Sequence, residues 1–299
     1  MTIYSQISSN KQKTVLIFAL FIVLISGFFY IIGLYYGNAN TYLVLGLAIS
    51  LMSSVFSYYF SDKVVLFSVG ATPATKERYF DFYSAAENMA IASGLPLPKL
   101  YVIPDAAPNA FATGRDPKHA VVCATEGLLG MMSRGELEAV IAHELSHIKN
   151  YDMLVMTVVT VLVGTVSLVA NWIVRSMWWG GGRRDDNDRE NRNPLMFVLL
   201  IIALIIAPLT ATLIQLAISR KREYLADADG VLLTRRPAEL ARALEKIAGY
   251  PASMKTATTA TAHLFISNPF KKNNKGDWLV SLFSTHPPIN ERIRILREM

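Results

Sequence analysis

Residues 140–148 read Val-Ile-Ala-His-Glu-Leu-Ser-His-Ile, a mostly apolar string in which two histidines stand four positions apart. Upstream, Ser133 and Glu136 have the spacing of a capping box, which predicts a helix that begins after Ser133 and runs through His147. On such a helix, side chains at positions i and i+4 project from the same face. The sequence therefore predicts that His143 and His147 point together at one site.

These histidines and the residue between them form the pattern His-Glu-x-x-His. In this pattern the two imidazoles can share one tetrahedral Zn²⁺, and the glutamate can accept a proton from water at the metal. This five-residue pattern also occurs by chance on amphipathic helices. The predicted cap and the apolar flanks favour the catalytic interpretation. We predict His143 and His147 as zinc ligands and Glu144 as the general base.

A catalytic zinc usually has three protein ligands, and no third histidine follows His147 at the metzincin spacing. We predict Glu223 as the third ligand, because it follows the apolar run Leu195–Ile218 and should return to the same membrane face as His147. Asp227, at i+4 from Glu223, is predicted to accept the free imidazole N–H of a ligand histidine. The alternative is that both carboxylates form solvated ion pairs with neighbouring arginines.

Long apolar runs indicate membrane helices. The chain is 52% hydrophobic and 17% charged, and four uncharged segments could cross a hydrocarbon core of about 30 Å. They are Val15–Tyr35, Tyr42–Phe60, Leu154–Val174 and Leu195–Ile218. We predict the first two as a transmembrane hairpin, while the second pair either spans the membrane or only dips into it.

The charge distribution predicts the orientation. Lys11 and Lys13 precede the first span and its exit loop has no Lys or Arg, which places the N-terminus and residues 62–152 in the cytoplasm. The arginine-rich turn between the third and fourth segments conflicts with this rule. The predicted division is a hairpin at 1–61, the first part of a catalytic domain at 62–152, a membrane hairpin at 153–218 and the rest of the domain at 219–299.

Other features limit the function classes. The net charge of +6 comes from Lys and Arg concentrated beside apolar runs, so we predict lipid contacts and no nucleic-acid binding. Cys123 is the only cysteine, which excludes an intrachain disulfide framework. Strand-like runs at Lys99–Ile103 and Ala120–Ala124 predict a small sheet.

Two histidines outside the motif need a different interpretation. His119 falls in a predicted turn, and His263 falls in the stretch Pro251–Asp277, whose Thr, Ala, Asn and Lys residues predict a mobile loop. Both are predicted as surface histidines and not as metal ligands.

With these residues, the sequence resembles the HtpX membrane metalloproteases. The resemblance rests on His143-Glu-Leu-Ser-His147 and Glu223-x-x-x-Asp227 between apolar hairpins, on Pro108–Gly114 and on Thr285–Arg292, and it extends over nearly the whole chain. It implies a predominantly α-helical membrane protein with a cytoplasmic α+β domain of the gluzincin type and one Zn²⁺ per chain.

The resemblance also implies a role. It is that of an endopeptidase of the bacterial cytoplasmic (inner) membrane that degrades misfolded or damaged membrane proteins and unfolded polypeptides, as quality control under heat or envelope stress. A more distant similarity to the CAAX prenyl proteases leaves a dedicated processing protease as an alternative. An inactive membrane scaffold is a second alternative, although the predicted ligands and base are all present.

The resemblance further implies an edge strand that pairs with an extended substrate, formed by Asn109, Ala110, Phe111, Ala112 and Thr113. Adding a strand reads the main chain and tolerates varied side chains. An ordinary loop leading into the next strand is the alternative.

Near the C-terminus, His286 and Arg292 are predicted to stabilise the oxyanion that forms when water attacks a peptide carbonyl. Pro287 and Pro288 stiffen the backbone beside His286, which would hold the imidazole in place. The alternative is that the prolines introduce a surface helix on which Arg292 is solvated.

Overall fold

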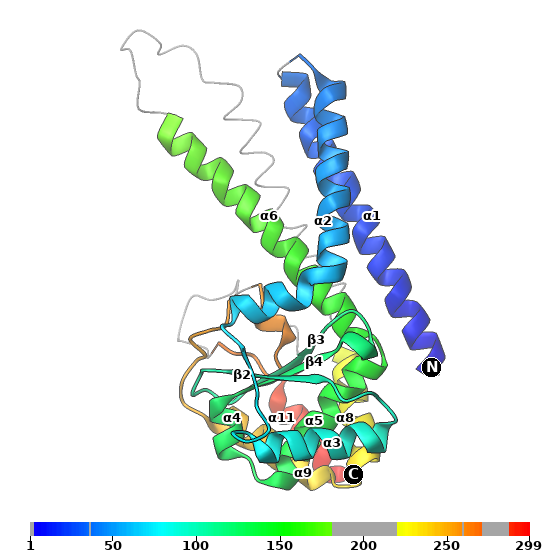
Figure 1. The fold of residues 1–299 in the computed structure, drawn as a ribbon, viewed down its shortest axis with the longest axis vertical. Coiled ribbons are helices and arrows are strands. Elements are labelled where there is room, and N and C mark those ends of the chain that lie inside the picture. Colours follow the sequence, from blue (N-terminus) through cyan, green and yellow to red (C-terminus); the bar gives the residue numbers. More distant parts are fainter. Residues whose placement is uncertain (1–2, 36, 181–219, 259, 271–286) are drawn as a thin grey trace.

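Two long helices at the N-terminus form a hairpin that projects from the rest of the molecule (Figure 1). The computed structural model describes residues 3–35, 37–180, 220–258, 260–270 and 287–299. Helix α1 (Ile3–Tyr35) and helix α2 (Ala39–Ser68) contain the two candidate membrane spans of this described part, Gln6–Leu34 and Ala39–Ser68. The predicted N-terminal pair of apolar helices is confirmed. Helix α2 continues past the predicted end of its span at Phe60.

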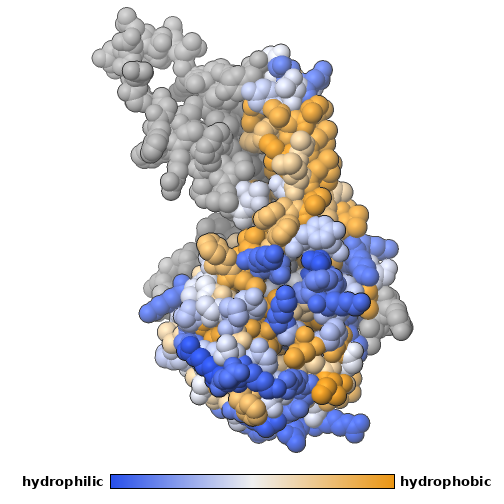
Figure 2. All heavy atoms as spheres, in the orientation of Figure 1, coloured by the Kyte–Doolittle hydropathy of each residue, from blue (hydrophilic) through white to orange (hydrophobic). Residues whose placement is uncertain are grey.

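The surface of this hairpin is apolar. Only 22% of each candidate span is buried, and side chains such as Val23 and Phe67 are 70% and 90% exposed. Figure 2 shows hydrophobic residues gathered over the hairpin, whereas many hydrophilic residues cover the domain below it. An exposed apolar surface of this extent is unfavourable in water and favourable in a hydrocarbon core.

Helix α6 (Asp152–Gly180) is the third long helix and contains the predicted segment Leu154–Val174. It follows α5 (Arg134–Lys149) after an 80° bend, and these two helices together make at most one further candidate span. Tyr151 in the bend has a left-handed backbone with φ of 60°. The other predicted arm, Leu195–Ile218, lies outside the described residues, so the second hairpin remains a prediction.

A small mixed sheet lies in the domain below the hairpin, near the lower ends of α2 and α6 (Figure 1). Its strand order is β1 (Thr72–Pro73), β2 (Lys99–Ile103), β4 (Val121–Thr125) and β3 (Ala110–Thr113). Strand β4 pairs in parallel with β2 and antiparallel with β3, which leaves β3 at the edge. The two predicted strands are therefore confirmed, and all five residues of β4 are buried, as its continuous apolar run leads one to expect.

Helices pack around α5, which is buried at nearly every position from Glu136 to Ile148. The helices that contact α5 are α3 (Phe80–Ser93), α8 (Arg220–Thr234), α9 (Pro237–Gly249) and the following helix α6, and α11 (Ile289–Glu298) packs on α9 and α8. The short elements are α4 (Glu126–Met131) and the 3-10 turns η1 (Pro117–His119) and η2 (Ala262–Leu264). A mostly helical fold with a small sheet is thus confirmed, and its central helix carries the predicted motif.

The described part of the predicted loop Pro251–Asp277 contains no regular element except η2, but part of it is packed against the sheet. Phe265 is fully buried against the ring of Phe111, and Ile266 donates its backbone N–H to Ala110 O at 2.9 Å. His263 is also buried, with Nε2 3.1 Å from Thr160 Oγ1, so its predicted surface position is wrong. His119 does lie in an exposed turn, where it pairs with Asp116. The polar composition around these residues hid a short apolar run that packs on the sheet.

Candidate metal centre

The register of α5 is fixed at its first turn. Glu136 donates its backbone N–H to Ser133 Oγ, and Glu136 Oε2 accepts the Ser133 backbone N–H at 2.7 Å, which confirms the predicted capping box. Burial raises the pKa of Glu136, but the Lys246 ammonium at 2.6 Å and the Ser133 hydrogen bonds leave that pKa below its ordinary value. Because the helix begins at a fixed residue, the directions of His143 and His147 are fixed as well.

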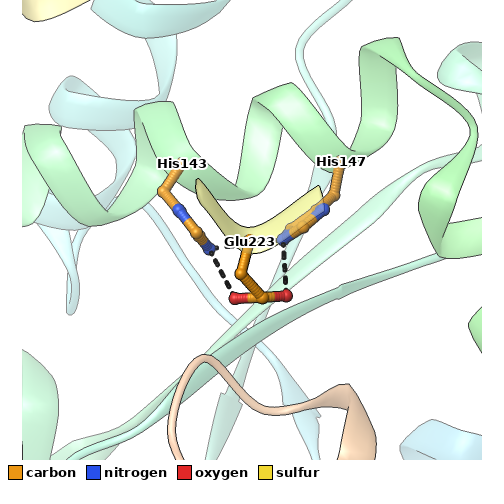
Figure 3. A group of neighbouring side chains, drawn as sticks. All are labelled: His143, His147 and Glu223. Atoms are coloured by element: carbon orange, nitrogen blue, oxygen red, sulfur yellow. Dashed lines mark hydrogen bonds and ion pairs between the residues drawn. The ribbon is translucent and has the colours of Figure 1, made fainter. Parts of the chain in front are cut away.

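The three predicted ligands meet at one point (Figure 3). His143 Nε2 lies 3.7 Å from Glu223 Oε2, His147 Nε2 lies 3.6 Å from Glu223 Oε1, and the two Nε2 atoms are 3.2 Å apart. All three residues are buried, and they are the group of potential metal ligands that the described part of the chain brings together. Ligand atoms about 2.0–2.2 Å from a tetrahedral ion lie roughly 3.3 Å from one another, which this spacing approaches.

The ring nitrogens support the same conclusion. Each histidine has its Nδ1 near a carboxylate oxygen, at 2.9 Å for His143 and Asp227 and at 3.2 Å for His147 and Asp152. A carboxylate favours a proton on the nitrogen that faces it, so in the neutral rings both Nε2 atoms carry lone pairs. Two lone pairs facing each other at 3.2 Å beside a carboxylate repel unless a proton or a metal ion lies between them. The donor set therefore fits a metal ion.

Asp227 lies behind His143, where the sequence placed it behind one of the ligand histidines. Its two oxygens accept hydrogen bonds from Arg292 Nε at 2.8 Å and Arg292 Nη2 at 2.6 Å. Arg292 Nη1 also lies 3.3 Å from Glu223 Oε2 and donates to Ile266 O. Burial raises the pKa of Asp227, but Arg292 and His143 outweigh it and leave the pKa below its ordinary value.

Asp152 lies behind His147 and was missed in the sequence. It stands at the start of α6, and its Oδ1 atom is 3.2 Å from Arg222 Nη1. The bend between α5 and α6 turns its carboxylate back toward His147. A signal was present, because an acidic residue follows the motif closely and begins an apolar helix, but the direction of its side chain depends on the bend.

Helix α8 brings Glu223 and Asp227 against α5 at very short range. A Cβ atom on Gly230 would lie 3.1 Å from the His143 backbone nitrogen, so the glycine permits this approach. Asp229 Oδ2 also accepts hydrogen bonds from Ser146 and Asn150 at the end of α5. Sequence reasoning identified the carboxylates on this helix but neither of these contacts.

Glu144 is buried beside the candidate ligands. Burial raises its pKa to about 7, and the Glu223 carboxylate adds to this rise while His147 opposes it. Within the described part of the chain, its buried Oε1 atom has no hydrogen-bond partner. A carboxylate with a pKa near neutrality and an oxygen free to accept a proton has the properties of a general base.

The remaining predicted site residues have varied positions. Ala110, Phe111, Ala112 and Thr113 form the edge strand β3, directly preceded by Asn109. Arg292 is 1% exposed and its guanidinium contacts Asp227, Glu223 and Ile266, so it lies behind the ligands. His286 lies outside the described residues, and its predicted oxyanion role remains a prediction.

Comparisons with known proteins cover the whole chain. Residues 80–299 match the model of Peptidase family M48. The "Protease HtpX homolog" of Thermoanaerobacter pseudethanolicus is 46% identical over 301 residues, covering 100% of this chain and 98% of the relative. The homolog of Pyrococcus furiosus is 44% identical over 289 residues, covering 96% and 95%.

The crystal structure of S. mikatae Ste24p has a similar fold, with a TM-score of 0.50 at 18% sequence identity. The match covers 98% of this chain and 67% of that protein. The match to a metallopeptidase family accords with the His-His-Glu group, and the relatives match over nearly their full length. The chain therefore belongs to peptidase family M48 and is a membrane protease of the HtpX type.

Proposed function

We propose that this protein is a zinc-dependent endopeptidase that cleaves unfolded polypeptides and misfolded membrane proteins at the cytoplasmic face of a membrane. The observation that carries the proposal is the buried group of His143, His147 and Glu223 beside the unpaired Oε1 of Glu144. When bound, zinc supplies the Lewis acidity that makes water a nucleophile near neutral pH. The two nitrogens and one carboxylate suit that metal.

The protein's own residues then carry the proton. Glu144 accepts a proton from the attacking water at its Oε1 atom and delivers it to the nitrogen of the leaving amine. Asp152 is hydrogen-bonded to His147 Nδ1 and the Asp227 carboxylate lies 2.9 Å from His143 Nδ1, so both favour a proton on Nδ1 and keep the Nε2 atoms available to the metal. Arg292 balances the charge of Asp227 and Glu223 and holds their side chains in position.

Substrate binding is proposed at the edge of β3. Its outer edge is partly covered, because Ala110 O already accepts the Ile266 N–H and the Asn109 side chain contacts Ser267. Ala112 is two residues further along the strand and therefore faces the same edge. Its backbone N–H lowers the pKa of the Glu144 carboxyl, which places it near that side chain. A substrate strand that pairs at Ala112 would therefore place its main chain beside the general base.

The orientation is proposed from the Lys11 and Lys13 bias, with residues 62–152 in the cytoplasm. A cysteine at the exposed Thr75 should resist a membrane-impermeant thiol reagent in intact cells, and one at the exposed Asn38 should react. Cys123 can remain, because it is fully buried. Labelling in the opposite pattern would reverse the orientation and exclude cytoplasmic substrates.

The catalytic proposal is tested with Glu144→Gln, which removes the base but leaves the three ligands. Casein hydrolysis in detergent should fall by about 10²–10⁴-fold with metal content unchanged. Glu223→Ala should instead lose metal. Glu138→Gln, on the same helix and paired with Asn88 and Arg134, is the matched control and should behave as wild type. Near-normal turnover in Glu144→Gln would exclude the mechanism.

A further inference from the structure

The first membrane helix reaches the metal centre through one buried polar side chain. Asn10 of α1 is 3% exposed, and its Nδ2 atom donates to Asp152 Oδ1 at 2.7 Å and to Asn150 O at 2.8 Å. Both amide hydrogens are therefore used on residues at the junction between α5 and α6. A buried amide with two short bonds to another part of the chain fixes the relative position of the two parts.

The first hydrogen bond of Asn10 goes to Asp152, whose carboxylate faces the candidate ligand His147. Asp152 Oδ2 is the atom that contacts His147 Nδ1, while Oδ1 is held by Asn10 and by Arg222. Asn10 and Arg222 thus fix one oxygen so that the other points at the imidazole. Carboxylates that orient a ligand histidine influence metal affinity strongly, so a group that orients such a carboxylate acts on the metal site through it.

The second hydrogen bond of Asn10 goes to the backbone oxygen of Asn150, which lies at the strained bend between α5 and α6. Asn150 precedes Tyr151, whose φ of 60° is costly for a residue with a side chain. Lys11 Nζ lies 4.6 Å from the centre of the Tyr151 ring. Two successive residues of α1 therefore hold the bend that turns Asp152 back toward His147.

We infer that Asn10 is a positioning residue of the metal site, and that zinc affinity depends on the docking of the first membrane helix against the bend between α5 and α6. This inference rests on the proposed zinc peptidase function. It adds that the hairpin supports the geometry of one ligand besides anchoring the protein. The His143 side, whose partners are Asp227 and Arg292, has no contact of this kind among the described residues.

The test uses the full-length protein in detergent with Asn10→Ala and Asn10→Asp. Asn10→Ala removes both donors, and Asn10→Asp places a second carboxylate against Asp152. Zinc affinity, measured by competition with a chelator, should fall about 10–100-fold in each. In zinc-saturated protein, kcat for casein should fall while KM stays within about twofold. Thr14→Val is the matched control, because this buried threonine lies one turn later on α1 and donates to its own helix at Asn10 O.

A double-mutant cycle separates positioning from general loss of structure. If Asn10 acts through Asp152, Asn10→Ala should weaken zinc binding much less when Asp152→Asn is already present, and by its full amount when Asp227→Asn is present. Additive effects with Asp152→Asn, or a lower unfolding temperature with unchanged zinc affinity, would overturn the inference. Wild-type protein that binds no zinc or leaves casein intact would instead overturn the proposed function.

Discussion

His143 and His147 lie one turn apart on the same helix, yet different parts of the molecule support them. Asp227 and Arg292, which stand behind His143, come from the C-terminal part of the catalytic domain and are completely enclosed by it. Asp152, behind His147, belongs to the helix that leaves the domain. One half of the metal site therefore depends on the packing of the domain, and the other half depends on how the long helices meet it.

The two supporting arginines differ in the same way. The Arg292 side chain is 1% exposed and binds both oxygens of Asp227, whereas the Arg222 side chain is 15% exposed and binds one oxygen of Asp152. A fully buried ion pair costs a great deal to break, because the remaining charge has no water to replace its partner. A pair at the margin of the domain retains some hydration.

Replacement of the arginines should give the largest difference between the two sides. In metal-free protein, Arg292→Met should lower the free energy of unfolding by about 3–5 kcal/mol, because Asp227 and Glu223 remain charged and buried. Arg222→Met should lower it by about 1 kcal/mol, since the partly exposed Arg222 contributes less and Asp152 keeps its contacts with Asn10 and His147. Thermal unfolding in detergent measures both. Addition of Asp227→Asn to Arg292→Met should recover part of the loss, and equal losses in the two single variants would contradict the comparison.

Replacement of Asp227 or Asp152 should lower zinc affinity by similar amounts on the two sides. Asp227→Asn and Asp152→Asn should each weaken zinc binding by about 10–100-fold, because each variant removes the partner that fixes one imidazole. Chelator competition is the measurement. The effects on stability should separate the two, since Asp227→Asn leaves the buried Arg292 with one carboxylate fewer and Asp152→Asn leaves Arg222 partly hydrated. Normal zinc affinity in Asp152→Asn would show that the Asp152 contact with His147 has no role in metal binding.

The smallest effect concerns pH in the metal-free protein. Burial lowers the pKa of His143, and Asp227 only partly offsets it. For His147, Asp152 and Glu223 outweigh burial and raise the pKa to about 9. A raised pKa contributes stability that is complete below the unfolded value of about 6.5 and is lost as the pH rises through 9.

Stability without metal should therefore fall between pH 6.5 and 9, and Asp152→Asn should reduce this fall by about 1 kcal/mol. Unfolding temperatures in the presence of a chelator, taken across this range, provide the measurement. Asp227→Asn is the comparison from the other side and should leave the fall unchanged. An equal reduction in both variants would show that the two histidines titrate alike.

The sequence determined the features that depend on neighbouring residues. The capping box at Ser133 and Glu136 and the common face of His143 and His147 follow from helical spacing, and the structure confirms the cap and the helix. The apolar N-terminal hairpin follows from composition and length alone. Glu223 could be predicted by a longer argument, because the predicted second apolar hairpin would return the chain near its starting point.

Asp227 could be predicted from its i+4 spacing to Glu223, but tertiary structure alone decided which groups stand behind His147. Asn10 and Asp152 are far apart in the sequence, and only the bend at Tyr151 and the docking of α1 bring them together. Phe265, within a stretch whose composition predicted a loop, is buried because strand β3 presents Phe111 to it. Helical periodicity and capping depend on interactions between residues a few positions apart, so they can be recognised directly in the sequence. The partners of a buried charge are set by the packing of distant segments, which one sequence pattern does not encode locally.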